Sequence, residues 1–142
     1  MGNYRLLEDE TTGDFAFEAY GSSLEELFKY AGLATMSAMV DLSQLQGKQE
    51  YSFEIESPNL NMLFYEFLSE LIFVKDVKMV FFTDFEIQIR ENSGYKLHCK
   101  AKTTPIDNLK QDHFTDVKAA TMHHLIVEKQ GEQWYCKAIL DL

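Results

Sequence analysis

Carboxylates are the side chains of this sequence best suited to metal chemistry, with 23 Asp and Glu against 13 Lys and Arg. Three aspartates stand at the ends of predicted elements, where side chains from different segments can converge. Asp14 opens a predicted strand, Asp41 follows a predicted helix, and Asp141 comes just after the last predicted strand. Taken one at a time, each has an ordinary interpretation as a solvated cap or turn residue. Composition and spacing alone therefore do not single out these three from the other acids.

Neither cysteine has the sequence context of a nucleophile. Cys99 and Cys136 lie in stretches where apolar and polar residues alternate, which predicts strands with one buried face. A cysteine in such a position usually serves as a small buried hydrophobe. The chain also has no nucleophile-elbow motif and no Gly-rich phosphate loop. We therefore expect no catalysis by a cysteine, and little in the sequence supports a disulfide.

The adjacent His123 and His124 fall in a predicted strand running from about Val117 to Lys129. Neighbouring residues of a strand point to opposite faces, so both imidazoles could not bind one metal ion from there. The histidines and cysteines also lack the spacing of a zinc site. The sequence predicts structural roles for both histidines.

The net charge of −10 argues against direct binding to a nucleic-acid backbone, which requires clustered cations. It suits a protein that binds cations or docks on a basic partner. The opening residues lack the apolar core of a signal peptide, and no apolar run is long enough to span a membrane. We therefore expect a cytoplasmic protein with no membrane association.

Two stretches have the pattern of long helices. Ser22 and Ser23 are each followed three residues later by a glutamate, the spacing of a capping box, and this helix should end near Val40. The second should begin with Ser57 as N-cap and Pro58 as its first residue. Apolar residues at three- and four-residue steps predict its buried face. They are Leu60, Leu63, Phe64, Phe67, Leu68, Leu71 and Ile72.

The remaining chain alternates in the manner of strands, with turns at 92–94 and 130–131. The predicted order is strand, helix, strand, helix and then a four-strand meander. We therefore predict an α+β fold with two long helices packed on a largely antiparallel sheet. No linker or repeat interrupts residues 1–142, so a single domain is expected.

Six stretches, in order and with matching spacing, resemble the archease family. The terminal Asp-Leu, combined with a Val-Lys-Ala-x-Thr-x-His motif, is the most specific part. Glu10 and Thr11 stand where the family usually has Asp-His, and the tryptophan of the family's second helix is absent. The matching stretches are residues 11–21 (TTGDFAFEAYG), 23–28 (SLEELF), 39–42 (MVDL), 63–73 (LFYEFLSELIF), 117–123 (VKAATMH) and 138–142 (AILDL).

The resemblance implies that Asp14, Asp41 and Asp141 bind a divalent cation, with calcium expected. It further implies a non-enzymatic protein that activates an RtcB-type RNA ligase in tRNA splicing and RNA repair, by promoting guanylylation and repeated turnover of the ligase. Ligands that are all oxygen select hard cations, and converging carboxylates repel one another without one. Two alternatives remain open: a chaperone or modulator of other RNA-modifying enzymes that needs no metal, and a hydrolase using the same carboxylates.

Overall fold

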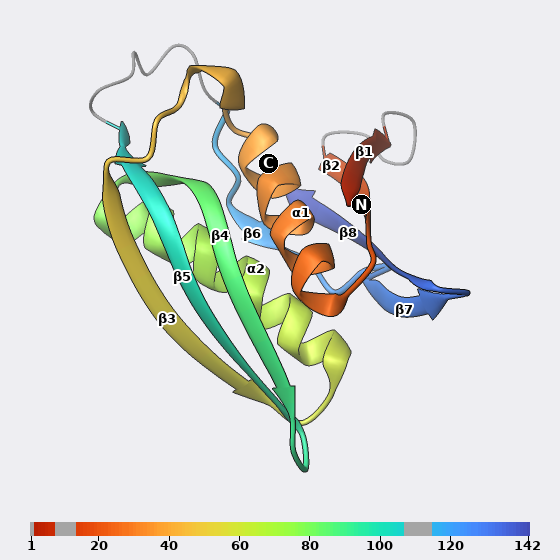
Figure 1. Cartoon of the computed structure of the whole chain (residues 1–142). Helices are drawn as coiled ribbons and strands as arrows, with labels where there is room; N and C mark the ends of the chain where they lie inside the picture. The colour runs from red at the N-terminus through yellow and green to blue at the C-terminus, as the bar shows by residue number, and fades with distance from the viewer. Residues whose placement is uncertain (1, 8–13, 107–114) are drawn as a thin grey trace.

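Two antiparallel sheets and two long helices make up the fold (Figure 1). The computed structural model describes residues 2–7, 14–106 and 115–142. The predicted α+β class is confirmed. In chain order the elements are β1 (Asn3–Leu7), β2 (Asp14–Gly21), α1 (Leu24–Ser37), the short 3-10 helix η1 (Leu42–Gln44), β3 (Gln49–Ser57), α2 (Leu60–Lys78), β4 (Val80–Glu91), β5 (Tyr95–Pro105), β6 (Ala119–Ala120), β7 (Ile126–Gln130) and β8 (Gln133–Asp141).

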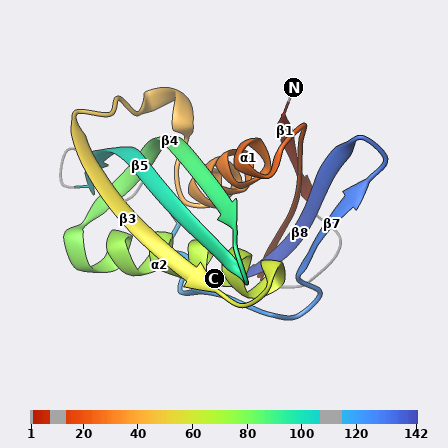
Figure 2. The same cartoon turned by 60° about the horizontal axis from the view of Figure 1, so that its bottom comes forward.

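The strands divide between a sheet ordered β1-β2-β8-β6, with β7 also paired to β8, and a three-stranded sheet ordered β3-β5-β4. The predicted meander through the second half of the chain is therefore wrong. The β4–β5 hairpin joins β3, whereas β8 pairs with β2 from the start of the chain. Both helices contact both sheets, and α1 lies between them (Figures 1 and 2).

Helix α1 begins as the capping pattern predicts. Ser23 is the N-cap, and its hydroxyl accepts a hydrogen bond from the Glu26 amide at 3.1 Å. The Glu26 carboxylate in turn accepts from the Ser22 amide at 2.9 Å, so orphan amides of the first turn are satisfied. The helix ends at Ser37, slightly before the predicted end near Val40.

Helix α2 begins two residues later than the sequence predicts. Ser57 is the last residue of β3, and the N-cap is Asn59, whose side chain accepts from the Met62 amide at 2.9 Å. The Ser57 hydroxyl instead donates to the Glu66 carboxylate at 2.6 Å. Strand pairing with β5 thus takes the residue that could have capped the helix. The predicted apolar face is confirmed, because all its members except the half-buried Leu60 are buried.

The predicted strand from about Val117 to Lys129 is also wrong. It is split into the short β6 and β7, with His123 and His124 in an exposed turn between them. His124 has φ 56°, a left-handed conformation that a continuous strand does not allow. The two imidazole centroids lie 3.9 Å apart instead of on opposite faces.

Both cysteines are buried and unpaired, as the strand patterns predict. Burial raises the pKa of the Cys99 thiol to about 12 and also raises the pKa of Cys136. Neither thiol is therefore available as a nucleophilic thiolate near neutral pH. Within the described ranges, neither helix is long and apolar enough to cross a bilayer.

Candidate metal centre at the strand ends

Asp14 and Asp141 lie directly opposite each other at one end of the larger sheet. Asp14 is the first residue of β2, Asp141 is the last residue of β8, and the antiparallel register pairs them. Side chains at opposed positions share a face, with Cβ atoms roughly 5 Å apart. Both residues are exposed, and neither has an ion-pair partner in the described part of the chain. Two such carboxylates repel each other and favour a bound cation.

The backbone of Asp141 is held from both sides. Strand β8 lies between β2 and β6, and Asp141 pairs with Ala119 as well as with Asp14. The Asp141 carbonyl accepts a hydrogen bond from the Lys118 amide at 2.8 Å. The backbone of Asp141 is thus paired with a strand on each side, which gives its exposed carboxylate a defined position.

Asp41 follows α1 and caps the short helix η1. Its Oδ1 atom accepts from the Ser43 hydroxyl at 2.8 Å and from the Ser43 amide at 3.0 Å. These two bonds lower the pKa of Asp41, so the carboxyl stays ionised. Its Oδ2 atom has no hydrogen bond to the described residues and remains open to a ligand.

Residues 115–118 connect the neighbourhood of Asp41 to that of Asp141. The Thr115 amide donates to the carbonyl of Met39 at 2.7 Å, two residues before Asp41, and Lys118 bonds to Asp141. Thr115 and Lys118 are three residues apart, and three extended residues span at most about 11 Å. The contact to Met39 and the contact to Asp141 therefore lie close to each other.

No third acidic, histidine or cysteine side chain within residues 2–7, 14–106 and 115–142 joins Asp14 and Asp141 closely enough to complete a metal site. The structure opposes Asp14 and Asp141 but does not bring Asp41 into one cluster with them, and a cation held by all three stays a prediction. Glu10 and Thr11, which replace the Asp-His of the family motif, lie outside the described residues. Two opposed carboxylates nevertheless fit a hard cation, since they offer only oxygen atoms.

The buried Lys75 is the residue near this site that our sequence reasoning missed. Its side chain is 2% exposed, and its ammonium donates to the Val117 carbonyl at 2.9 Å. It also pairs with the carboxylates of Asp116 and, at 2.6 Å, Asp76. The sequence did contain a signal for its burial, because Lys75 stands one helical turn after Leu71 on the apolar face of α2. Lys75 thus ties α2 to the segment that borders Asp141.

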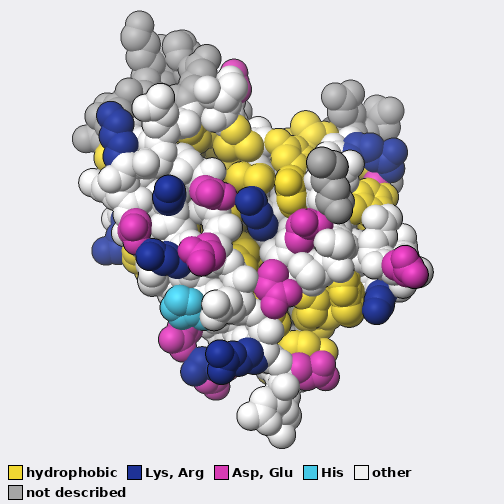
Figure 3. Space-filling view, viewed as in Figure 1, with side chains coloured by type: hydrophobic (Ala, Val, Ile, Leu, Met, Phe, Trp, Pro, Cys, Tyr) yellow, Lys and Arg dark blue, Asp and Glu magenta, His cyan; other side chains and the backbone are white. Residues whose placement is uncertain are grey.

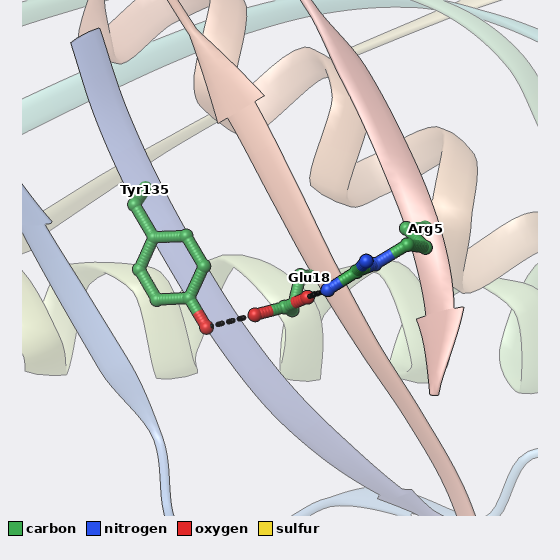
Figure 4. Close-up of polar contacts among 3 residues, drawn as sticks. All are labelled: Arg5, Glu18 and Tyr135. Atoms are coloured by element: carbon green, nitrogen blue, oxygen red, sulfur yellow. Dashed lines mark hydrogen bonds and ion pairs between the residues drawn. The ribbon is translucent and has the colours of Figure 1, made fainter. Parts of the chain in front are cut away.

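A polar network crosses the outer face of the same sheet (Figure 4). Glu18 of β2 accepts hydrogen bonds from Arg5 of β1 and from the Tyr135 hydroxyl of β8. Burial disfavours ionisation of Glu18, but the bonds from Tyr135 and Arg5 outweigh it and lower the pKa of the carboxyl. The network links the two strands that end in Asp14 and Asp141 to β1.

Comparison with known proteins shows to which family the chain belongs. The archease protein family model matches residues 4–142. The chain belongs to the archease family. An archease of Pyrococcus abyssi is 33% identical over 135 residues, covering 94% of this chain and 95% of that protein. An archease of Pyrococcus furiosus is 32% identical over the same shares of the two chains.

Solved structures support the archease fold. The solution structure of Methanobacterium thermoautotrophicum protein 1598 is 30% identical, with a TM-score of 0.79 over 99% of this chain and 98% of that one. The crystal structure of an archease from Thermotoga maritima, described as a possible chaperone, has a TM-score of 0.61 over 94% of each chain. At 22% identity, this second likeness supports the fold alone.

Proposed function

We propose that this archease-family protein activates an RtcB-type RNA ligase without catalysing a reaction itself. In this proposal, Asp14, Asp41 and Asp141 hold a divalent cation, which we assign as calcium. The protein promotes guanylylation of the ligase and so allows repeated turnover in tRNA splicing and RNA repair. The observation that carries the proposal is the opposition of Asp14 and Asp141 in a chain of the archease family.

The chain contributes carboxylates at fixed positions. Asp14 and Asp141 are set by strand register, while Ser43 holds one oxygen of Asp41 and leaves the other open. A bound cation supplies positive charge that can help to neutralise phosphate groups beside the ligase's own metal centre. With a net charge of −10, the protein docks on the ligase and leaves RNA binding to it.

Removing one carboxylate tests the proposal. Asp141→Asn keeps the side-chain volume and the backbone pairing of β8 but removes one negative charge from the site. We expect at least about a tenfold loss of stimulation in an assay of purified RtcB-type ligase, GTP and a divalent cation. Glu132→Gln, an exposed change in the turn between β7 and β8, is the matched control and should stimulate fully. Full stimulation by Asp141→Asn would overturn the assigned role of this site.

A chaperone that needs no metal is the alternative. It is favoured by exposed apolar side chains on α2, such as Phe73 and Val77. Suppression of aggregation in EDTA, unchanged in Asp141→Asn, would support this alternative. Binding of the ligase that depends on both the cation and Asp141 would support the activator.

A further inference from the structure

The outer edge of β3 is an open sheet edge. Strand β3 pairs with β5 on one side only, and no other described strand pairs with it. On two of the other edge strands an outward amide is already bonded. The Ile89 amide of β4 donates to Glu25 of α1 at 3.3 Å, and the Val127 amide of β7 donates to Asn61 of α2 at 3.2 Å. No side chain of the described residues bonds to the backbone of β3, so its outward amides and carbonyls are free to pair.

A groove of about 460 Å³ runs beside this edge, between β3 and α2. Ile55 of β3 and Phe73 of α2 give the groove an apolar lining. Phe73 is 60% exposed, and Val77, one helical turn further on, is 61% exposed. A chain lying along β3 would therefore cover apolar surface with every second side chain.

The same groove contains a carboxylate without a cation. Glu70 of α2 is half-buried and has no ion-pair partner among the described residues. Burial raises the pKa of Glu70, which shows that its charge is poorly solvated. Nearby, Glu66 is already bonded by Ser57, and Lys78 stands over the Tyr51 ring at 5.9 Å. An incoming ammonium or guanidinium group would stabilise the ionised form of Glu70.

The outer face of the three-stranded sheet alternates in charge from strand to strand, and mixed charges cover it in Figure 3. The central β5 presents Lys96, His98, Lys100 and Lys102, whereas the edge strand β3 presents Glu50, Glu54 and Glu56. The ion pairs between these strands are Lys96–Glu54 at 3.2 Å, Lys96–Glu56 at 3.7 Å and Lys100–Glu50 at 3.4 Å. A fourth strand beside β3 would continue the alternation if its outward residues were basic.

We propose that the β3 edge and the adjoining groove bind an extended segment of a partner protein, in which apolar residues alternate with Lys or Arg. The segment adds to the sheet as a fourth strand through backbone hydrogen bonds. Its apolar residues cover Ile55 and Phe73, and its basic residues face the glutamates of β3. A second copy of this chain fits poorly, because pairing two β3 strands would place glutamates opposite glutamates. The proposal does not depend on ligase activation.

A short synthetic peptide provides the probe. Acetyl-Lys-Val-Lys-Val-Lys-Val-Lys-Val-amide is close to the length of β3, and a labelled form reports binding through fluorescence anisotropy. Two further peptides carry backbone N-methyl groups either on the valines or on the lysines, so that each keeps the charge but loses the hydrogen-bond donors of one edge. We expect the peptide that is methylated on the edge facing β3 to bind at least about tenfold more weakly, and the other to bind nearly as the plain peptide does. Amide NMR shifts on binding should concentrate in β3 and in the α2 residues around Glu70 and Phe73.

Two charge reversals distinguish peptide binding in the groove from attraction of the peptide by the net negative charge of the protein. Glu70→Lys should weaken binding of the plain peptide about tenfold or more, whereas Glu128→Lys, an exposed change on β7, should weaken it less than about twofold. Phe73→Ala should also weaken binding. Asp141→Asn should bind the probe as the wild type does, which separates this proposal from the metal site.

Three results would overturn the proposal. Equal affinity for the plain peptide and both N-methylated peptides would show electrostatic attraction without strand addition. Equal losses in Glu70→Lys and Glu128→Lys would show that net charge, and not the groove, attracts the peptide. Sedimentation of the free protein as a dimer whose dissociation on dilution shifts the amide NMR signals of β3 would identify a second copy of the chain as the occupant of this edge.

Discussion

At the scale of single residues, Lys75 shows how a buried charge can position a site it does not belong to. Moving an ammonium out of water is unfavourable unless partners satisfy it. Here the carboxylates of Asp76 and Asp116 and the carbonyl of Val117 do so. Because Val117 precedes the residue bonded to Asp141, this interaction fixes one flank of the candidate metal centre.

Lys75→Met should lower the free energy of unfolding by about 1–3 kcal/mol, since the carbonyl of the buried Val117 loses its donor. The methionine fills most of the volume, so the loss should be small compared with a cavity. Urea unfolding measures the stability, and hydrogen exchange should become faster at residues 115–118. Lys78→Met, an exposed change on the same helix, should alter stability by no more than about 0.5 kcal/mol. Unchanged exchange in Lys75→Met would contradict the positioning role.

Glu18 should give the protein a pH-dependent contribution to stability. Its carboxyl has a lowered pKa in the folded state, so its contribution is fully present above the unfolded value of about 4.5 and is lost as pH falls through the lower folded value. Glu18→Gln should therefore cost about 1 kcal/mol near pH 7 and almost nothing once the pH has fallen below the lowered pKa of the folded state. Thermal unfolding across this pH range measures the difference. A constant difference at every pH would show that ionisation of Glu18 is irrelevant.

At the scale of elements, α2 packs through one apolar face on α1 and on the three-stranded sheet. Phe67 lies at its centre, fully buried, with ring centroids 5.3 Å from Phe28, 6.2 Å from Phe53 and 6.0 Å from Phe85. These partners come from α1, β3 and β4. Helix α2 therefore contributes the central residue of an aromatic cluster that it shares with α1, β3 and β4.

Phe67→Ala should destabilise the fold by about 3–5 kcal/mol, because it removes buried apolar area and leaves a cavity. The loss of function should come from reduced folded protein and not from weaker affinity. Phe73→Ala, on the exposed face of the same helix, should change stability by less than about 1 kcal/mol. Chemical unfolding of both variants measures the contrast. Wild-type stability of Phe67→Ala would show that the helix packs differently.

At the scale of the whole molecule, the candidate metal centre depends on segments from opposite ends of the chain. Asp14 lies in the first strand of the β2–β8 pair, and Asp141 is the penultimate residue. A cation bound there would stabilise only the folded state, because unfolding separates its ligands.

Calcium should accordingly raise the melting temperature of the protein. At a concentration about 100 times its dissociation constant, the gain is about 2.7 kcal/mol. For a chain of this size, that corresponds to a shift of roughly 5–10 °C. Calorimetric scans with calcium and with EDTA measure the effect, which Asp14→Asn should abolish. The absence of calcium or magnesium binding at millimolar concentration would contradict the site.

The features that local residue patterns encode could be predicted from the amino-acid order. The cap at Ser23, the apolar face around Phe67 and the alternation around Cys99 and Cys136 each report burial of one face of one element. Together these patterns were sufficient for the α+β class. The family motifs, and not spacing, selected Asp14, Asp41 and Asp141 from the other acids.

The pairing of elements that are distant in the chain became visible in the folded structure. Periodicity shows which face of a strand is buried but not which strand pairs with it, so the two separate sheets and the β2–β8 pairing were not predictable from pattern. Ser57 was lost as a helix cap because β3 extends to include it, and the histidine turn depends on a left-handed residue within an apparently regular strand. Two partners of Lys75, Asp116 and Val117, likewise lie 41 and 42 residues further along the chain and reach it only through the packed fold.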